Sequence, residues 1–145
     1  MTLSAIIERA NSVRRLQKDY QNPRPTRPSI ARINQHFGME LPEPLLEMVR
    51  CWRESATWFA SLGPDYDSEH HIIRINSYWR HRRRTRRLPR NLVIINLCHD
   101  EDCDCLDLDT ADATGGRYLV RYWSPEIESA GHCTLLEYFR RQFVP

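Results

Sequence analysis

The sequence predicts a single α+β domain in which helices pack on one side of a mostly antiparallel sheet of four to six strands. Amphipathic helical patterns occupy most of residues 2–90 and the last ten residues, while β-branched segments with short connections lie between residues 91 and 124. The chain has 145 residues, of which 41% are hydrophobic and 28% are charged. This length and composition are sufficient for a buried core without disulfides or metals.

The chain begins with a predicted helix over residues 2–20, where Ile6 and other apolar residues recur every three or four positions. Three prolines within residues 22–28 end this helix and predict an extended linker. We therefore predict an N-terminal helix and proline-rich linker over residues 1–28, followed by the main domain over residues 29–145.

Three more helices are predicted before the sheet. Ser29 has a side chain suited to the N-cap of the first helix, and Gly38 suits its C-terminal end. Pro44 suits the first turn of the second helix, because the missing N–H has no helical partner there. In the third helix Ile75 and Trp79 fall on one apolar face, which predicts that both enter the core.

The predicted sheet has three main segments and one shorter one. Residues 91–96 form an uninterrupted β-branched run, typical of a buried strand. Residues 104–109 alternate leucine with aspartate, and residues 117–124 form the next strand. The Thr-Gly-Gly sequence at residues 114–116 is predicted as a hairpin-type turn between them. An aromatic run at residues 57–60 predicts a further short strand.

A helix is predicted to close the chain. Thr134 and Glu137 have the three-residue spacing of a capping box, which predicts the start of this helix. The amphipathic patterns also predict which large side chains are buried in the core, namely Trp52, Trp79, Ile94 and Phe139.

Charge is distributed unevenly along the chain. Residues 1–90 contain 17 basic and 9 acidic side chains, whereas residues 91–145 contain 4 and 10. The basic excess centres on residues 80–90, with seven arginines, and the acidic excess centres on residues 100–109. Such asymmetry indicates either an interaction surface or two segments that neutralise each other, and both interpretations stay open.

Five segments together resemble the SUKH superfamily in their order and spacing over residues 29–143. They are Phe37-Gly38-Met39-Glu40-Leu41-Pro42 before a helix, Leu88-Pro89-Arg90-Asn91-Leu92-Val93-Ile94-Ile95 at the start of a strand, Cys105-Leu106-Asp107-Leu108, Val120-Arg121-Tyr122-Trp123 and Leu135-Leu136-Glu137-Tyr138-Phe139. The resemblance implies an α+β domain that binds other proteins. The superfamily includes bacterial immunity proteins that neutralise polymorphic or contact-delivered toxins, often nucleases, and fungal cell-wall assembly regulators. Enzymatic activity is not typical of it.

The resemblance implies an immunity protein that neutralises a cognate toxin by stoichiometric binding. Two alternatives stay open: a regulatory protein–protein interaction module without a toxin, and a nucleic-acid binder that uses residues 80–90. The sequence has no nucleophile elbow, zinc-protease motif or phosphate-binding glycine loop, so we expect neither enzymatic activity nor a cofactor. The N-terminus lacks the features of a secretion signal and no apolar run approaches about 20 residues, so we expect a cytoplasmic protein that does not enter membranes.

Carboxylates are the first candidate contacts for the toxin. A nuclease has a basic face for nucleic acid, and an acidic loop can mimic phosphates and accelerate association with that face. The alternative is a solvated turn, or an internal partner for the arginines. The candidates lie in the acidic segment, in the loop before the third main-domain helix, and in the turn after Trp123: Asp100, Glu101, Asp102, Asp104, Asp65, Asp67, Glu126 and Glu128.

Arginines are the second candidate contacts, for a partner that is itself anionic. Tyr78 and Trp79 precede them and can stack on bases, although Trp79 falls on an apolar helix face. The alternative is a solvated helix face followed by a loop. The candidates are Arg82, Arg83, Arg86 and Arg87.

Thiol and imidazole side chains near the acidic segment raise the question of a metal. Cys98, His99, Cys103 and Cys105 are possible donors, but structural zinc sites usually pair cysteines two to four residues apart in two separate knuckles. The glycine and the regular oxygen spacing of a calcium loop are also absent from the sequence. We therefore predict no bound metal.

Overall fold

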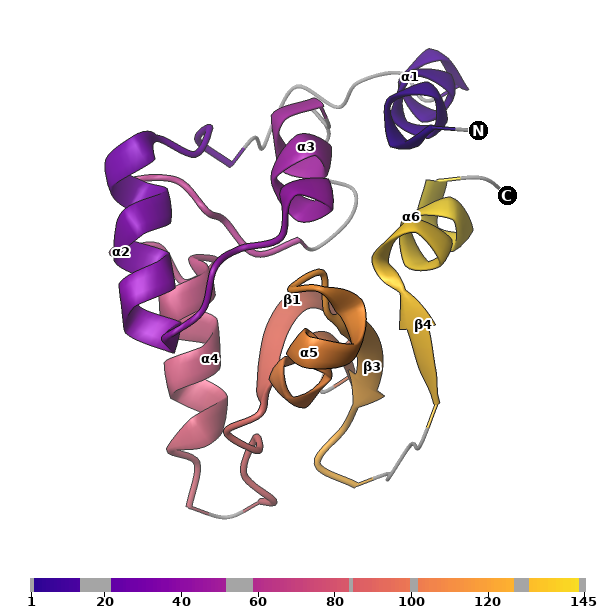
Figure 1. Cartoon of the computed structure of the whole chain (residues 1–145). Helices are drawn as coiled ribbons and strands as arrows, with labels where there is room; N and C mark the ends of the chain where they lie inside the picture. The colour runs from indigo at the N-terminus through magenta and orange to yellow at the C-terminus, as the bar shows by residue number, and fades with distance from the viewer. Residues whose placement is uncertain are drawn as a thin grey trace.

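The computed structural model describes residues 2–13, 22–51, 59–83, 85–99, 102–126 and 131–143 (Figure 1). Within these residues helices surround a four-stranded antiparallel sheet, which confirms the predicted α+β fold. The elements are, in chain order, α1 (Leu3–Val13), α2 (Arg27–Phe37), α3 (Glu43–Cys51), α4 (Ile72–Arg80), β1 (Leu92–His99), β2 (Asp102–Asp107), the 3₁₀ helix η1 (Leu108–Thr110), α5 (Ala111–Thr114), β3 (Leu119–Trp123), β4 (His132–Thr134) and α6 (Leu135–Phe143).

The strands follow one another in space as they do in the chain, in the order β1-β2-β3-β4. Val93 of β1 lies opposite Leu106 of β2, which lies opposite Val120 of β3, which in turn lies opposite Cys133 of β4. The first three strands confirm the three predicted segments. β4 was not predicted, because a strand of three residues is too short to show an alternating pattern.

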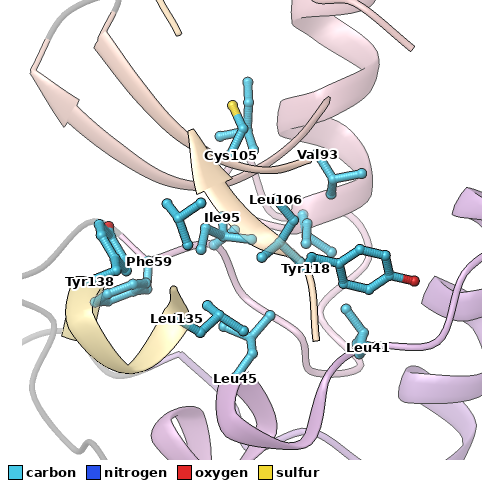
Figure 2. Packing of buried hydrophobic residues seen from close by; sticks show 14 of the residues in the cluster. Leu41, Leu45, Phe59, Val93, Ile95, Cys105, Leu106, Tyr118, Leu135 and Tyr138 are labelled. Carbon is cyan, nitrogen blue, oxygen red and sulfur yellow. The ribbon is translucent and has the colours of Figure 1, made fainter. Parts of the chain in front are cut away.

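The main core lies between one face of the sheet and helices from both ends of the chain. Figure 2 shows Leu45 of α3 and Leu135 of α6 pointing toward Leu106 and Ile95, while Cys105 points to the opposite side of β2. Apolar burial of this kind stabilises the fold by about 25 cal/mol for each Å² removed from water.

The N-terminal helix and the described part of the linker pack on this core. Leu3 and Ile6 of α1 are buried, and α1 lies against α3 and α6 (Figure 1). The amide of Asn22 donates to the carbonyl oxygen of Phe59 at 3.0 Å. At Gly63, a Cβ atom would lie 2.6 Å from the carbonyl oxygen of Pro23, so a glycine is needed where the linker crosses this loop.

Helix α4 lies along the outer edge of β1, where its Asn76 side chain takes the place of a neighbouring strand. The Asn76 amide group donates to the carbonyl oxygen of Ile94 at 3.0 Å, and its Oδ1 accepts from the N–H of Ile94 at 2.7 Å. Further along the same edge, the N–H of Ala60 donates to the carbonyl oxygen of Ile95. The edge is thereby covered, which prevents pairing with other chains. Of the predicted strand at residues 57–60, residues 59–60 make this contact and the rest lie outside the described residues.

The connection from β2 to β3 is helical, and here two predictions were wrong. β2 ends at Asp107 instead of continuing to residue 109, because the Asp107 carboxylate accepts from the N–H of Asp109 at 3.1 Å and caps η1. Residues 114–116 do not form a hairpin-type turn. Gly115 adopts a φ of +61° and ends the short helix α5, which is a conformation that glycine tolerates without steric cost.

The caps of α2 and α6 test two further predictions. Thr26, not Ser29, is the N-cap of α2, because the Thr26 hydroxyl accepts from the Ser29 N–H while the Ser29 hydroxyl accepts from the Thr26 N–H. Gly38 ends this helix with a φ of +63°, as predicted. The capping box of α6 is also confirmed, with N–H to side-chain distances of 3.1 and 3.2 Å between Thr134 and Glu137.

Three of the four large side chains predicted in the core, those of Trp79, Ile94 and Phe139, are buried. The fourth, Trp52, lies outside the described residues. None of the helices in the described ranges combines the length and the apolarity that a membrane span requires.

Candidate partner-binding surface

Two of the predicted toxin-binding carboxylates lie on β2 and not in a loop, which corrects the placement expected from the sequence. The Tyr122 hydroxyl donates to Oδ1 of Asp102 at 2.7 Å, and the Tyr138 hydroxyl donates to Oδ2 of Asp104 at 2.7 Å. Asn96 of β1 in turn donates to the Tyr138 oxygen at 2.8 Å. Each carboxylate is therefore the hydrogen-bond acceptor of a tyrosine of the same protein.

The other predicted carboxylates lie on separate segments. Asp65 accepts a hydrogen bond from the hydroxyl of Ser61 in the loop before α4, and Asp67 in the same loop is exposed. Glu126 is exposed three residues after β3. The remaining predicted carboxylates lie outside the described residues: Asp100, Glu101 and Glu128.

The arginine-rich segment after α4 is a loop closed by its own hydrogen bonds. The N–H of Leu88 donates to the carbonyl oxygen of Trp79 at 3.2 Å, and the Leu88 side chain is buried. The Arg80 guanidinium donates to the carbonyl oxygen of Leu92 at 3.0 Å, and Arg87 donates to that of Arg82 at 3.1 Å. Of the four predicted arginines, Arg82 is partly buried. The other three are exposed: Arg83, Arg86 and Arg87.

Two of these arginines lie over aromatic rings. The Arg82 guanidinium carbon is 4.7 Å from the Trp79 ring centre and 5.3 Å from that of Tyr78, and the Arg86 carbon is 6.0 Å from the ring of Trp123. At these distances a guanidinium is attracted to the negative face of the ring. Trp79 and Trp123 are buried, so they are not available to stack on bases, whereas Tyr78 is 59% exposed. We call Tyr78, Arg82 and Arg86, together with the buried rings of Trp79 and Trp123 over which the two guanidinium groups lie, the arginine–aromatic surface.

A groove of about 1090 Å³ runs beside α4 next to this surface. Its lining combines apolar side chains with basic ones from α4, from the residues that follow it and from β1. They include Arg74, Ile75, Tyr78, His81, Arg82 and Leu97. The exposure of Tyr78 follows from its position off the apolar stripe of α4. That Leu97 and Arg74 line the same groove has no signal in the sequence, because it depends on how β1 lies against α4.

The candidate metal donors are only partly within the described residues. Cys103 and Cys105 are two positions apart on β2, so they point to the same face, and both are buried. The side chains of Cys98 and His99 lie outside the part of the chain that the structure describes. Among the described residues no group of three or more His, Cys, Asp or Glu side chains is placed to hold a metal ion.

A hydrogen-bonded pair of a buried carboxylate and a solvent-exposed imidazole, not predicted from the sequence, joins β2 to the edge strand β4. Oδ2 of Asp107 lies 2.9 Å from Nε2 of His132, and its Oδ1 accepts from the Asn91 amide at 3.1 Å. Burial alone raises the pKa of Asp107, but the hydrogen bonds from His132, Asn91 and the Asp109 N–H outweigh that effect and lower the pKa below its usual value. The Asp107 carboxylate is therefore held in its charged form at the end of the sheet.

His71 is a buried N-cap that holds the start of α4. Its Nδ1 accepts from the N–H of Ile73 at 3.2 Å, and its Nε2 lies 2.9 Å from the carbonyl oxygen of Gly63. Burial lowers the pKa of His71 below the ordinary 6.5. The Gly63 carbonyl and Asp65 partly oppose this shift, whereas Arg32 reinforces it. The imidazole is consequently neutral in the fold at neutral pH.

We expect the free energy of unfolding to decrease as the pH is lowered through 6.5. His71 binds a proton more readily in the unfolded chain, so acid favours unfolding until the pH falls below the lowered pKa. The pKa of His36, on the exposed side of α2, is also lowered, by partial desolvation and by the charges of Arg80 and Arg32, and contributes in the same direction. Urea midpoints between pH 7.5 and 4.5 measure the effect. His71→Asn, which keeps a capping oxygen without titrating, should have a weaker pH dependence than the parent, and an equally steep one would contradict the assignment.

Comparisons with known proteins bear on the fold. No known protein family matches the sequence, and no curated protein does. The structure is similar to the crystal structure of a protein from Pseudomonas syringae pv. tomato, with a TM-score of 0.66 and 14% sequence identity over 94% of each chain. At this identity the likeness establishes a shared fold: an α+β domain that extends over nearly the whole chain.

Proposed function

We propose that this protein is an immunity protein that neutralises a cognate toxin by binding it stoichiometrically, without catalysis. The observation that carries the proposal is the arginine–aromatic surface beside the groove of α4. Tyr78 is exposed there between Arg74 and Arg82. Tyrosine, tryptophan and arginine supply most of the binding energy at protein interfaces, where they cluster in pockets. The resemblance to the SUKH superfamily supports a toxin as the partner.

The surface is suited to binding because its side chains are already ordered. The Tyr78 and Trp79 rings meet edge to face, with centres 5.5 Å apart, and Arg82 lies over both. Immobilising a flexible side chain at an interface costs about 0.5–1.5 kcal/mol, and contacts formed before binding reduce this cost. Inhibition then requires only that the bound protein cover the toxin's active site or substrate channel.

The exposed carboxylates have a secondary role in this proposal. Asp67 and Glu126 are exposed, so they can attract a basic region of the toxin and increase the association rate. Asp102 and Asp104 are joined to tyrosines of the fold and are only partly exposed. We expect substitutions of the exposed pair to change the salt dependence of association more than the dissociation rate.

The proposal predicts a stable complex with the product of a neighbouring toxin gene. Expression of that gene alone should arrest growth, and co-expression of this protein should restore it. The purified proteins should elute as one species of fixed stoichiometry in size-exclusion chromatography with light scattering. A neighbouring product that binds without being toxic would instead indicate the regulatory module, and a toxin that neither binds nor is neutralised would refute the immunity function.

The nucleic-acid alternative rests on the exposed arginines of residues 81–90. We expect only weak binding to RNA, because acidic side chains such as Glu69 and Asp67 lie near the start of α4. Each phosphate contact adds close to one unit to the salt slope of affinity. Sub-micromolar RNA affinity with a steep salt slope, lost when Arg82, Arg83, Arg86 and Arg87 are changed together to alanine, would favour this alternative over the toxin.

A further inference from the structure

The groove beside α4 has walls of two kinds, and their chemistry indicates what it binds. Ile75 and Leu97 contribute apolar surface, and Tyr78 stands at the side with its ring 59% exposed. Among the described residues the other exposed large hydrophobic side chain is Leu136, on α6, which is 40% exposed. An exposed tyrosine beside an apolar floor can pack against a side chain of a bound segment and offer its hydroxyl to a polar group.

The charges of the lining favour a ligand with a carboxylate. Among the described residues of the lining are two guanidinium groups, those of Arg74 and Arg82, the imidazole of His81 and one carboxylate, that of Glu69. A guanidinium presents planar N–H pairs that match a carboxylate. In this described part of the lining, two arginines and one glutamate leave a small excess of positive charge. It suits one or two carboxylates of a peptide better than the repeated phosphates of a nucleic acid.

The groove is rigid on the side of the helix. Arg74 donates to the carbonyl oxygen of Asp67 at 2.8 Å, which holds the start of the wall. Asn76 fixes the middle of α4 to β1, and Trp79 packs edge to face against Trp123 with ring centres 5.9 Å apart. A bound segment therefore meets side chains that need little reordering, which favours affinity.

We propose that this groove docks an acidic segment of the toxin, with one carboxylate paired to Arg74, a second paired to Arg82, and a neighbouring apolar side chain packed on Tyr78. The inference rests on the proposed function for the identity of the partner. The chemistry of the docked segment rests on the groove alone. This proposed contact differs from the one expected from the sequence, in which carboxylates of this protein bind a basic toxin, because here the toxin supplies the negative charge.

A peptide probe tests the groove without any toxin. The probe is a capped hexapeptide of alternating glutamate and leucine, and it is compared with the matching lysine–leucine hexapeptide and with a ten-nucleotide oligouridylate. In amide NMR titrations, the acidic peptide should shift the signals of α4 and of Leu97, and Arg74→Glu or Tyr78→Ala should weaken its binding at least about fivefold. The matched controls are the exposed Arg117→Glu and Leu136→Ala, which should bind as the parent does.

Several results of this titration would overturn the inference. They are shifts that lie away from α4, groove variants that bind as well as the parent, equal binding of the lysine peptide, and tighter binding of the oligouridylate than of the acidic peptide. The NMR spectrum of each variant also reports whether it is folded. If Arg74→Glu is unfolded, Arg74→Gln is a milder replacement.

The toxin complex supplies the second test. In calorimetry with the parent protein's cognate toxin, Tyr78→Ala and Arg74→Glu should each weaken affinity about tenfold or more, while the two controls change it less than about twofold. If the parent binds and protects but the groove variants do so equally well, the groove inference fails and the proposed function stands. If the parent binds no toxin while the acidic peptide still occupies the groove, the proposed function fails and the groove is a site for another acidic protein.

Discussion

Replacing Asn76 by alanine is expected to destabilise the fold by about 3 kcal/mol, because the change leaves two buried backbone groups of β1 without partners. Asn76 is fully buried, and its amide bonds both the N–H and the carbonyl oxygen of Ile94. It also donates to the carbonyl oxygen of Ile72 one turn earlier in α4. The urea midpoint should decrease by about 1–2 M, given a slope of about 2 kcal/mol per M for a chain of this size.

A second substitution at this position separates hydrogen bonding from packing. Asn76→Asp keeps an acceptor for the N–H of Ile94 but points an oxygen at the carbonyl oxygens of Ile72 and Ile94, so it too should destabilise the fold. Ser77→Ala, at the next and partly exposed position, is the matched control and should change stability by less than about 0.5 kcal/mol. If Asn76→Ala and the parent unfold at the same urea concentration, the edge bonds do not hold α4 in place.

The same substitution should weaken toxin binding if the variant remains folded. Asn76 does not line the groove, but it sets the position of α4 on β1 and thus of Arg74 relative to Leu97. A shift of α4 should also alter the near-ultraviolet circular dichroism of the Trp79–Trp123 pair, whose rings meet at 78°. A variant with reduced stability, an unchanged aromatic signal and unchanged affinity would show that the groove does not depend on this contact.

Replacing Asp107 by alanine is expected to cost about 3 kcal/mol as well. The change removes the shared acceptor of Asn91, His132 and the Asp109 N–H, and the carboxylate that it removes is only 4% exposed. Asp107→Asn should cost less, because an amide oxygen can still accept from some of these donors while the charge is lost. Asp112→Asn, an exposed aspartate in α5, is the control and should leave stability nearly unchanged.

The stabilisation by Asp107 depends on pH in a direction that follows from its lowered pKa. The folded carboxyl releases its proton more readily than the unfolded one, whose pKa is 3.8, so the unfolded chain binds more protons in acid. The stabilisation by the Asp107 carboxylate is complete at pH values above the pKa of the unfolded chain. It is lost as the pH falls through the lower pKa of the folded protein. The stability difference between the parent and Asp107→Asn should therefore be constant from pH 5 to 7 and decrease below pH 4. A constant difference down to pH 3 would contradict the lowered pKa of the Asp107 carboxyl.

Local patterns in the sequence were sufficient to predict much of the secondary structure. The apolar stripe of Ile75 and Trp79 predicted α4, the β-branched run predicted β1, and the capping box at Thr134 predicted the start of α6. Each of these signals arises within a few residues, because helix and strand periodicity record which face of an element avoids water. For the same reason, the exposure of Tyr78 could be predicted from its place off the stripe.

The contacts that build the candidate site depend on tertiary structure instead. An asparagine in the middle of a helix gives no local sign that it will bond a strand 18 positions away, as Asn76 does with Ile94. Tyr138 and Asp104 are 34 positions apart, so nothing in the sequence indicated their hydrogen bond, and Asp104 was predicted only as a toxin contact, with a solvated turn or a partner of the arginines as alternatives. Patterning therefore determined the elements and the buried face of each. The packing of distant elements decided which polar side chains are paired inside the fold and which, like Arg74, line a groove together with residues of another element. The physical reason is that a polar side chain carries no local record of its partner.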